Sequence, residues 1–318
     1  MTANIQGSAS ADRFLVLKTS ESQLILDAAP GTRPSVLYWG PALENANPKE
    51  LALLSVRQWT HGGTAVDVSA SLSNELGAGV LGPPGVIVHR NSTDWAAVFR
   101  VTQVSYLDTH RVRIVCRDDN THMCATYEIA LDPDSHVLSA HTSIENLGKV
   151  PVIIDWCATL CLPLNRRLTR IKSFTGRWAM EFQQQTVPAF QGTYLRENNR
   201  GRPSHDNFPG LIATAEFTSE KNETAVGFHL GWSGNTRVRV DRHTDGRAFV
   251  QMGELFPPGE MVLEENDRYT PPTLYAAWSE KGLNQLAQRF HRHLRDKVMD
   301  PRTRGKARPV HYNTWEAV

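Results

Sequence analysis

The chain has 318 residues, of which 40% are hydrophobic and 21% are charged, and its formal net charge is +1. This length allows one large domain or two modest ones. A charge so close to zero produces no long-range field that would favour nucleic acid or an anionic membrane. No apolar stretch is long enough to cross a bilayer. Residues 1–14 are polar and lack the pattern of a secretory signal, so we expect a cytoplasmic protein.

Most of the chain is predicted to form β-strands. Short alternating or β-branched runs recur between Gly, Pro, Asn and Asp residues that favour turns. These runs cover residues 14–17, 23–26, 111–116, 137–144, 152–155, 224–230 and 236–240. The last of them, T-R-V-R-V, alternates with a period of two. Many strands with little helical periodicity predict an all-β fold of stacked antiparallel sheets.

One helix is predicted late in the chain, over residues 283–298. Its apolar face is formed, at three-to-four spacing, by Leu283, Leu286, Phe290, Leu294 and Val298. Ser279 precedes this helix and is a candidate cap for its N-terminus. Residues 299–310 contain prolines, a glycine and several basic residues, a composition that predicts a connector. No aromatic side chains alternate with the basic ones to stack bases, so binding of nucleic acid is not expected.

The cysteines are Cys116, Cys124, Cys157 and Cys161. Cys157 and Cys161 would face the same side of one strand, but no further His or Cys near them completes a zinc site. We therefore expect buried, reduced thiols, and we expect neither a metal nor an organic cofactor.

Four segments carry a family resemblance. They are S-N-E-L-G-A-G-V-L-G-P-P-G-V-I-V-H-R at residues 73–90, G-R-P-S-H-D-N-F-P-G at 201–210, G-F-H-L-G-W-S-G-N at 227–235 and R-P-V-H-Y-N-T-W-E-A-V at 308–318. In this order they resemble segments of α-galactosidases of glycoside hydrolase family 36, and the second and fourth are the more specific. In that family a large N-terminal β-supersandwich, similar in fold to galactose mutarotases, precedes a catalytic (β/α)₈ barrel.

The resemblance implies a division of the chain into three parts. Residues 1–278 would form the supersandwich, residues 279–308 the helix and linker, and residues 309–318 the first strand of a barrel whose remainder is missing. The loop at residues 201–210 would be structural and would pack the sandwich against the barrel. Some members of the family are tetramers, so a homo-oligomer is expected.

The resemblance also implies a function. The family cleaves terminal α-galactosyl residues of melibiose- and raffinose-type oligosaccharides with retention, using two aspartates of the barrel that such a mechanism places roughly 5 Å apart. The K-W-D-type motif of the nucleophile does not occur in this sequence. The chain is thus expected to contain no catalytic residue and to be inactive by itself.

Two tryptophans match family positions that line the sugar pocket. Trp178 lies in G-R-W-A-M-E and Trp315 in N-T-W-E-A. An indole can cover the apolar C–H face of galactose while its N–H donates to a hydroxyl group. The alternative is that both are core or interface aromatics. Val80 stands where several members carry an aspartate, so that sugar contact is not expected here.

Two other functions remain open from the sequence. A mutarotase of similar fold would use a His and a Glu within the sandwich, and His89, His141 and His229 lie in predicted strands. A carbohydrate-binding or assembly module is the second alternative. Against it, the apolar side chains at the C-terminal end, such as Val310 and Tyr312, would be an aggregation liability in a finished monomer.

Overall fold

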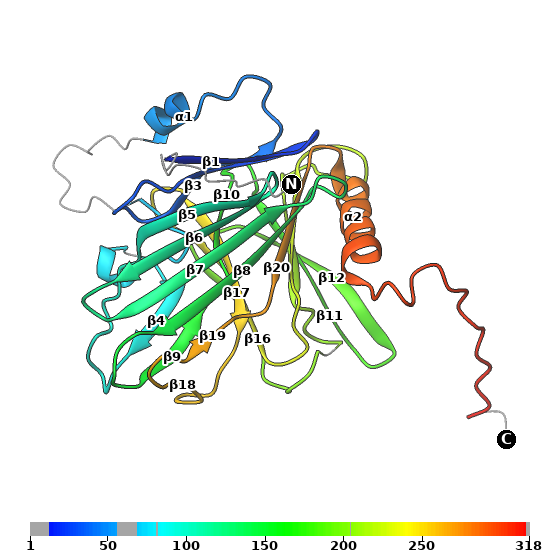
Figure 1. Cartoon of the computed structure of the whole chain (residues 1–318). Helices are drawn as coiled ribbons and strands as arrows, with labels where there is room; N and C mark the ends of the chain where they lie inside the picture. Colours follow the sequence, from blue (N-terminus) through cyan, green and yellow to red (C-terminus); the bar gives the residue numbers. More distant parts are fainter. Residues whose placement is uncertain (1–12, 56–68, 81, 204, 316–318) are drawn as a thin grey trace, which may run out of the picture.

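The computed structural model describes residues 13–55, 69–80, 82–203 and 205–315, and it confirms the expected all-β fold (Figure 1). Its largest sheet has ten antiparallel strands. Along this sheet lie β12 (Met180–Pro188), β11 (Arg170–Arg177), β14 (Gly210–Thr214), β15 (Ala225–Leu230), β20 (Leu274–Ser279), β8 (Val137–Asn146), β7 (Met123–Leu131), β6 (Arg111–Asp118) and β5 (Arg100–Asp108), with β19 (Arg268–Tyr269) pairing with β8.

Three smaller antiparallel sheets complete the described part of the sandwich. One contains β10 (Cys161–Leu164), β17 (Ala248–Glu254), β16 (Thr236–Arg242) and β13 (Gly192–Asn198); another contains β1 (Phe14–Lys18), β2 (Ser22–Asp27) and β3 (Ser35–Pro41); the third contains β18 (Met261–Leu263), β9 (Val152–Cys157) and β4 (Val86–His89). Each of the seven predicted runs coincides with a strand. The single difference is Thr224, which lies one residue before the start of β15.

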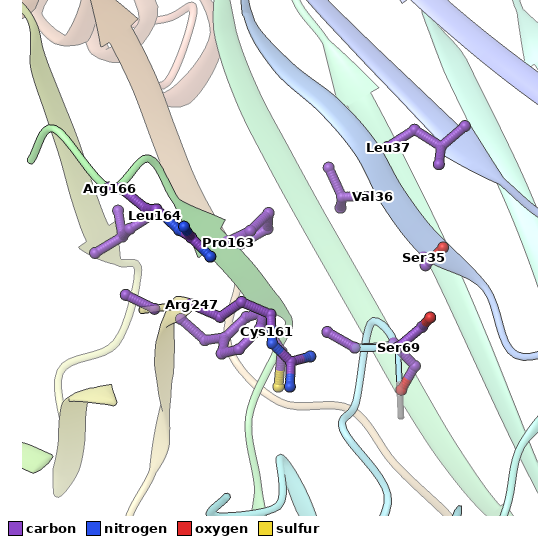
Figure 2. A pocket seen from close by; sticks show the side chains of 13 residues that line it. Ser35, Val36, Leu37, Ser69, Cys161, Pro163, Leu164, Arg166 and Arg247 are labelled. Atoms are coloured by element: carbon purple, nitrogen blue, oxygen red, sulfur yellow. The ribbon is translucent and has the colours of Figure 1, made fainter. Parts of the chain in front are cut away.

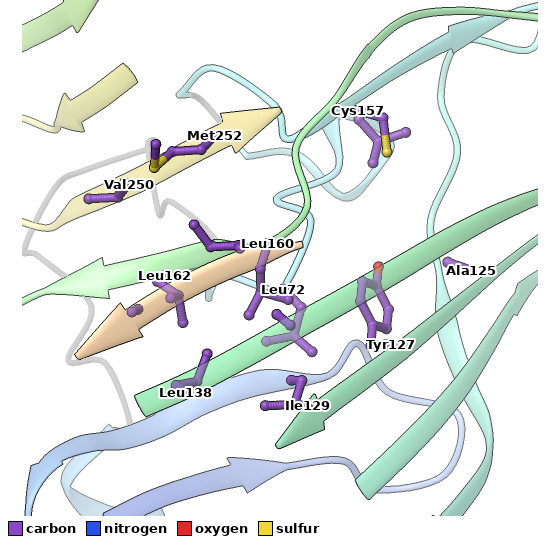
Figure 3. Packing of buried hydrophobic residues seen from close by; sticks show 14 of the residues in the cluster. Leu72, Ala125, Tyr127, Ile129, Leu138, Cys157, Leu160, Leu162, Val250 and Met252 are labelled. Carbon is purple, nitrogen blue, oxygen red and sulfur yellow. The ribbon is translucent and has the colours of Figure 1, made fainter. Parts of the chain in front are cut away.

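The core lies between these sheets because their strands alternate buried and exposed positions. In β6, Val112 and Ile114 are fully buried whereas Arg111 and Arg113 face solvent. Figure 3 shows the packing, in which side chains of β7 and β8 meet those of the opposite β10 and β17. Among them are Tyr127, Ile129, Leu138, Leu162, Val250 and Met252.

The predicted C-terminal helix is confirmed as α2 (Gly282–His293), followed by a single π turn, η2 (Leu294–Val298). Leu286 is buried against the sheet, but Leu294 and Val298 at the end of the same face are exposed. Ser279 is not the cap, because the helix begins after Lys281 and the Ser279 hydroxyl instead donates to the carbonyl of Gly282.

Two short helical segments were not predicted. They are α1 (Pro48–Ser55) and the 3₁₀ turn η1 (Leu76–Ala78).

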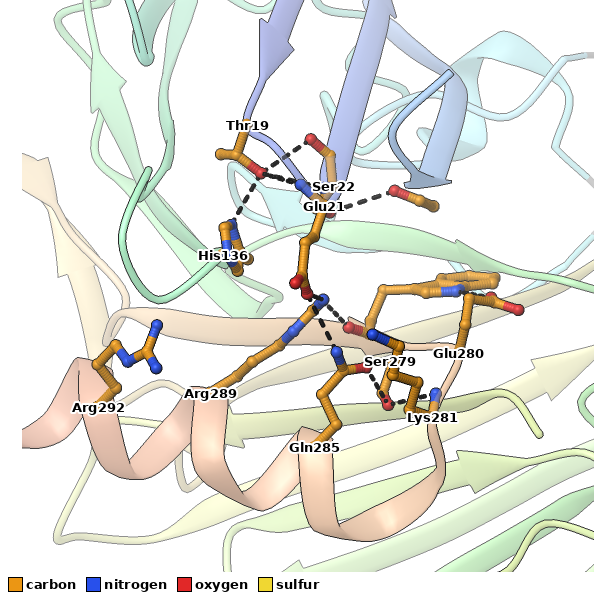
Figure 4. A network of polar contacts seen from close by, with 12 residues as sticks. Thr19, Glu21, Ser22, His136, Ser279, Glu280, Lys281, Gln285, Arg289 and Arg292 are labelled. Atoms are coloured by element: carbon orange, nitrogen blue, oxygen red, sulfur yellow. Dashed lines mark hydrogen bonds and ion pairs between the residues drawn. The ribbon is translucent and has the colours of Figure 1, made fainter. Parts of the chain in front are cut away.

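Polar contacts fix α2 to two turns of the sandwich (Figure 4). The buried guanidinium of Arg289 donates to the carboxylate of Glu21 at 2.5 Å, and the side-chain amide of Gln285 donates to the same oxygen at 3.0 Å. The hydrogen bond from Arg289 lowers the pKa of Glu21. His136, in the β7–β8 turn, lies 2.9 Å from the hydroxyl of Thr19, which connects this turn to the β1–β2 turn.

All four cysteines are buried and free, as expected. Burial raises the pKa of Cys157 to about 12, so its thiol stays protonated. Cys157 ends β9 and Cys161 begins β10, so the expectation that both lie on one strand is wrong. Among the residues that the structure describes, no group of three or more metal-binding side chains occurs, and no helix is long and apolar enough to cross a membrane.

Candidate functional site

Trp178 lies in the turn of the β11–β12 hairpin, which projects from one end of the ten-stranded sheet (Figure 1). Its side chain is 82% exposed. Ala179 next to it adopts a positive φ of 63°, and the backbone N–H of Ala179 donates to the carboxylate of Glu181 at 2.8 Å. The turn therefore holds a large aromatic side chain in solvent, where it can contact another molecule.

An aromatic cluster supports the hairpin from below. Phe182 stacks on Phe174 with ring centroids 4.7 Å apart, and Phe208 packs edge-on against Phe182 at 5.0 Å. Phe208 in turn stacks on the imidazole of His229, at 5.1 Å. This series of rings extends from β15 across the sheet to β12, and aromatic pairs of this kind add to the free energy gained by burial alone. The sequence analysis missed the cluster, because three phenylalanines without regular spacing give no local signal.

The loop at residues 201–210 is joined to the hairpin and to the third family segment. The N–H of Gly201 donates to the side-chain oxygen of Asn235 at 2.7 Å, and the hydroxyl of Thr175 donates to the carbonyl of Asp206 at 3.0 Å. The side chain of Asp206 pairs with Arg200 at 2.7 Å. The second and third family segments thus lie together and support the strand that leads to Trp178. Contact of this loop with a barrel stays a prediction.

The first family segment has a different role. The guanidinium of Arg90 is 6% exposed and donates to the side chain of Asn146 at 2.7 Å and to the carbonyl of Val150 at 3.1 Å. Arg90 therefore connects β4 to the end of β8 and the residues after it, in the interior. Val80 in the same segment is buried.

Trp315 lies in the extended C-terminal segment that follows η2. Its side chain is 85% exposed, and its backbone N–H donates to the side-chain oxygen of Asn313 at 2.9 Å. Within residues 299–315 the structure shows no strand, and the segment extends away from the sandwich on the side where the hairpin projects (Figure 1). The structure does not bring Trp315 and Trp178 into contact, and their roles as pocket walls stay predictions.

The histidines considered for a mutarotase lie in three different surroundings. His89 on β4 pairs with Asp155 at 3.4 Å. His141 faces Glu128 across the β7–β8 pairing on the exposed side of the sheet, where Glu128 is bound by Arg113 at 2.6 Å. His229 stacks on Phe208, and burial lowers its pKa. The three histidines therefore do not form one site.

Two of the concave regions in the described structure have different surroundings, and only the second borders the support of the hairpin. A pocket of about 240 Å³ lies between β3, β10 and β17, and Arg166 and Arg247 stand at its rim (Figure 2). The guanidinium of Arg166 donates to the backbone carbonyl of Asp245 at 2.8 Å, and that of Arg247 donates to the carboxylate of Asp245 at 2.7 Å, so Arg247 is paired with a negative charge. A groove of about 520 Å³ runs between α2 and the sheet. Its lining is mainly apolar and includes Phe174 and Phe208 of the aromatic cluster together with Phe290, Leu294 and Val298.

The fold is a large β-sandwich with an aromatic hairpin at one end. Comparison with known proteins assigns the chain to a family. The model of the glycosyl hydrolase family 36 N-terminal domain matches residues 32–264, and the melibiase model matches residues 268–318. The chain belongs to glycosyl hydrolase family 36. An α-galactosidase of Escherichia coli is 34% identical over 306 residues, covering 96% of this chain and 42% of the relative.

Solved structures show the same fold. The family 36 α-galactosidase AgaB of Geobacillus stearothermophilus superposes with a TM-score of 0.84 at 18% identity, over 98% of this chain and 46% of AgaB. AgaA from the same organism, in complex with stachyose, gives a TM-score of 0.82 over 93% of this chain and 45% of AgaA. The chain thus spans less than half the length of the relatives that it matches.

Proposed function

We propose that this chain is the N-terminal part of a retaining α-galactosidase that acts on terminal α-galactosyl residues of melibiose- and raffinose-type oligosaccharides. The observation that carries the proposal is the match of both family models in succession, over nearly all of the chain. The ligands of a structural neighbour agree with this class, because AgaA variants were solved in complex with stachyose and with raffinose.

In this proposal the sandwich contributes a wall of the sugar site. Trp178 is exposed on a hairpin whose base is held by the aromatic cluster and by the loop at residues 201–210. A support of this kind fixes the hairpin that carries the indole, so that less conformational entropy is lost when a sugar ring packs on it. Trp315 would form a second wall from the segment that follows α2. The C–H face of galactose would lie on the indoles, and its hydroxyls would accept from the indole N–H groups.

The proposal assigns the catalytic carboxylates to a following barrel. A retaining mechanism needs a nucleophile and an acid/base carboxylate on opposite sides of the scissile bond. We propose that these are two aspartates beyond residue 318, that the 318-residue chain by itself hydrolyses no α-galactoside, and that the enzyme is a cytoplasmic homo-oligomer. No metal or organic cofactor is part of this mechanism.

The test is to read the coding DNA downstream of the Val318 codon and to assay the 318-residue chain with raffinose. We expect a reading frame that continues into a barrel with a K-W-D-type aspartate, and no release of galactose by the shorter chain. A stop codon directly after Val318 would refute the hydrolase for this gene product. The chain would then be a carbohydrate-binding or assembly module, which a titration with galactose would test next.

A further inference from the structure

The ten-stranded sheet has two outer strands, and only one of them is protected from pairing. The register between β5 and β6 shifts twice, at Val101/Gln103 and at Tyr106/Asp108. The outer side of β5 is also occupied, because the N–H of Gly31 donates to the carbonyl of Val101 at 2.9 Å and the N–H of Val101 donates to the carbonyl of Thr32 at 2.8 Å. Irregular register and capping of this kind prevent association between sheet edges.

The opposite edge, β12, carries neither feature along most of its length. Its register with β11 is regular from Gln183 to Pro188, and every side chain of the strand except Val187 is exposed. Glu181 is the one charged residue among its nine. Within the described residues no strand lies beside the outer side of β12. A long, regular and nearly uncharged edge is a template for another strand.

We propose that the partner of β12 is β12 of a second copy of this chain, paired antiparallel across a twofold axis that passes through Gln184. Two identical antiparallel strands form an isologous contact of this kind without further adjustment. The glutamine triplet 183–185 is its own reverse, so this register places Gln184 opposite Gln184 of the other copy and Gln183 opposite Gln185. All three cross-strand pairs then join amide side chains, which hydrogen-bond to one another across strands.

The charge of the hairpin strand agrees with this register. Glu181 falls opposite Val187 of the other copy, so no like charges face each other. This inference rests on the homo-oligomer of the proposed function and names the surface that forms it, but it requires no catalytic activity.

Cysteine crosslinking of the 318-residue chain tests the register. Residues that face each other across an antiparallel pair have Cα atoms about 4.5 or 5.5 Å apart, a spacing that a disulfide can bridge. Gln184→Cys should form a disulfide-linked dimer with oxidised glutathione. Gln183→Cys is the matched control. In this register residue 183 lies diagonally from residue 183 of the other copy, about 7–8 Å away, which is too far for a disulfide. The four native thiols are buried and do not compete. Equal crosslinking of the two variants, or none, overturns the register.

A charge exchange tests the pairing without crosslinking. In Gln183→Lys/Gln185→Glu, each of the two cross-strand pairs between positions 183 and 185 joins a lysine to a glutamate. In Gln183→Lys/Gln185→Lys, each of these two pairs joins two lysines. We expect the dimer dissociation constant of the second variant, measured by light scattering, to be roughly tenfold higher than that of the first. Far-UV circular dichroism confirms that both fold. A monomeric wild-type chain refutes the oligomer and the strand pairing together, and an oligomer that is insensitive to both variants refutes the strand pairing alone.

Discussion

Two tryptophans of this chain lie in opposite surroundings. Trp156 on β9 is fully buried between the sheets, its indole N–H donates to Gln251 at 3.1 Å, and the guanidinium of Arg237 lies 4.9 Å from its ring centre. Trp178 stands in solvent on the hairpin turn. The ring and the N–H of Trp156 thus both have partners within the chain, whereas the hairpin end leaves a supported aromatic side chain exposed. That difference separates the residues that maintain the sandwich from those available to a ligand.

The largest effect is expected in the interior. Trp156→Ala should lower the free energy of unfolding by about 4 kcal/mol, because it leaves a cavity and removes the donor to the side-chain oxygen of Gln251. Urea denaturation followed by circular dichroism measures this loss. Trp232→Ala, at a partly exposed tryptophan, is the control and should cost far less. A loss below 1 kcal/mol for Trp156→Ala would contradict the assigned packing.

A smaller effect is expected at the support of the hairpin. Phe208→Ala should lower the free energy of unfolding by about 1.5 kcal/mol, because the half-buried ring contacts Phe182 and His229. Tryptic cleavage after Arg177 should also become faster. Phe217→Ala is the matched control, since its ring is exposed, and it should change neither quantity. Cleavage that is unchanged in Phe208→Ala would show that the cluster does not hold the hairpin.

The attachment of α2 should depend on pH. Burial lowers the pKa of His136 and of His293, so the unfolded chain binds more protons than the folded one as the pH falls below about 6.5. Glu21, whose pKa is lowered by Arg289, adds a loss of stability below about pH 4.5. The free energy of unfolding should therefore decrease steadily from pH 7 to pH 4. His136→Asn with His293→Gln should flatten the upper part of this curve, and an identical curve would contradict the assignment.

Much of the fold could be predicted from the sequence because burial imposes a period of two on its strands. The run at residues 236–240 alternates arginine with valine and forms β16 as expected. The apolar face of α2 was predicted too, yet Leu294 and Val298 remain exposed, since spacing does not tell which part of a helix the sheet covers. The aromatic cluster under the hairpin depends on contacts between distant segments, which no local pattern reveals. Trp178 was found through family resemblance rather than periodicity.

In the proposed function the hairpin end contacts the sugar, whereas the interior stabilises the sandwich. The most direct measurement is the hydrolysis of raffinose by the protein that the complete reading frame encodes, with and without Trp178→Ala. We expect galactose release by the wild type, a KM about tenfold higher for Trp178→Ala, and a change of less than about 0.5 kcal/mol in its free energy of unfolding. An absence of galactose release, or a KM that Trp178→Ala leaves unchanged, would contradict this proposal.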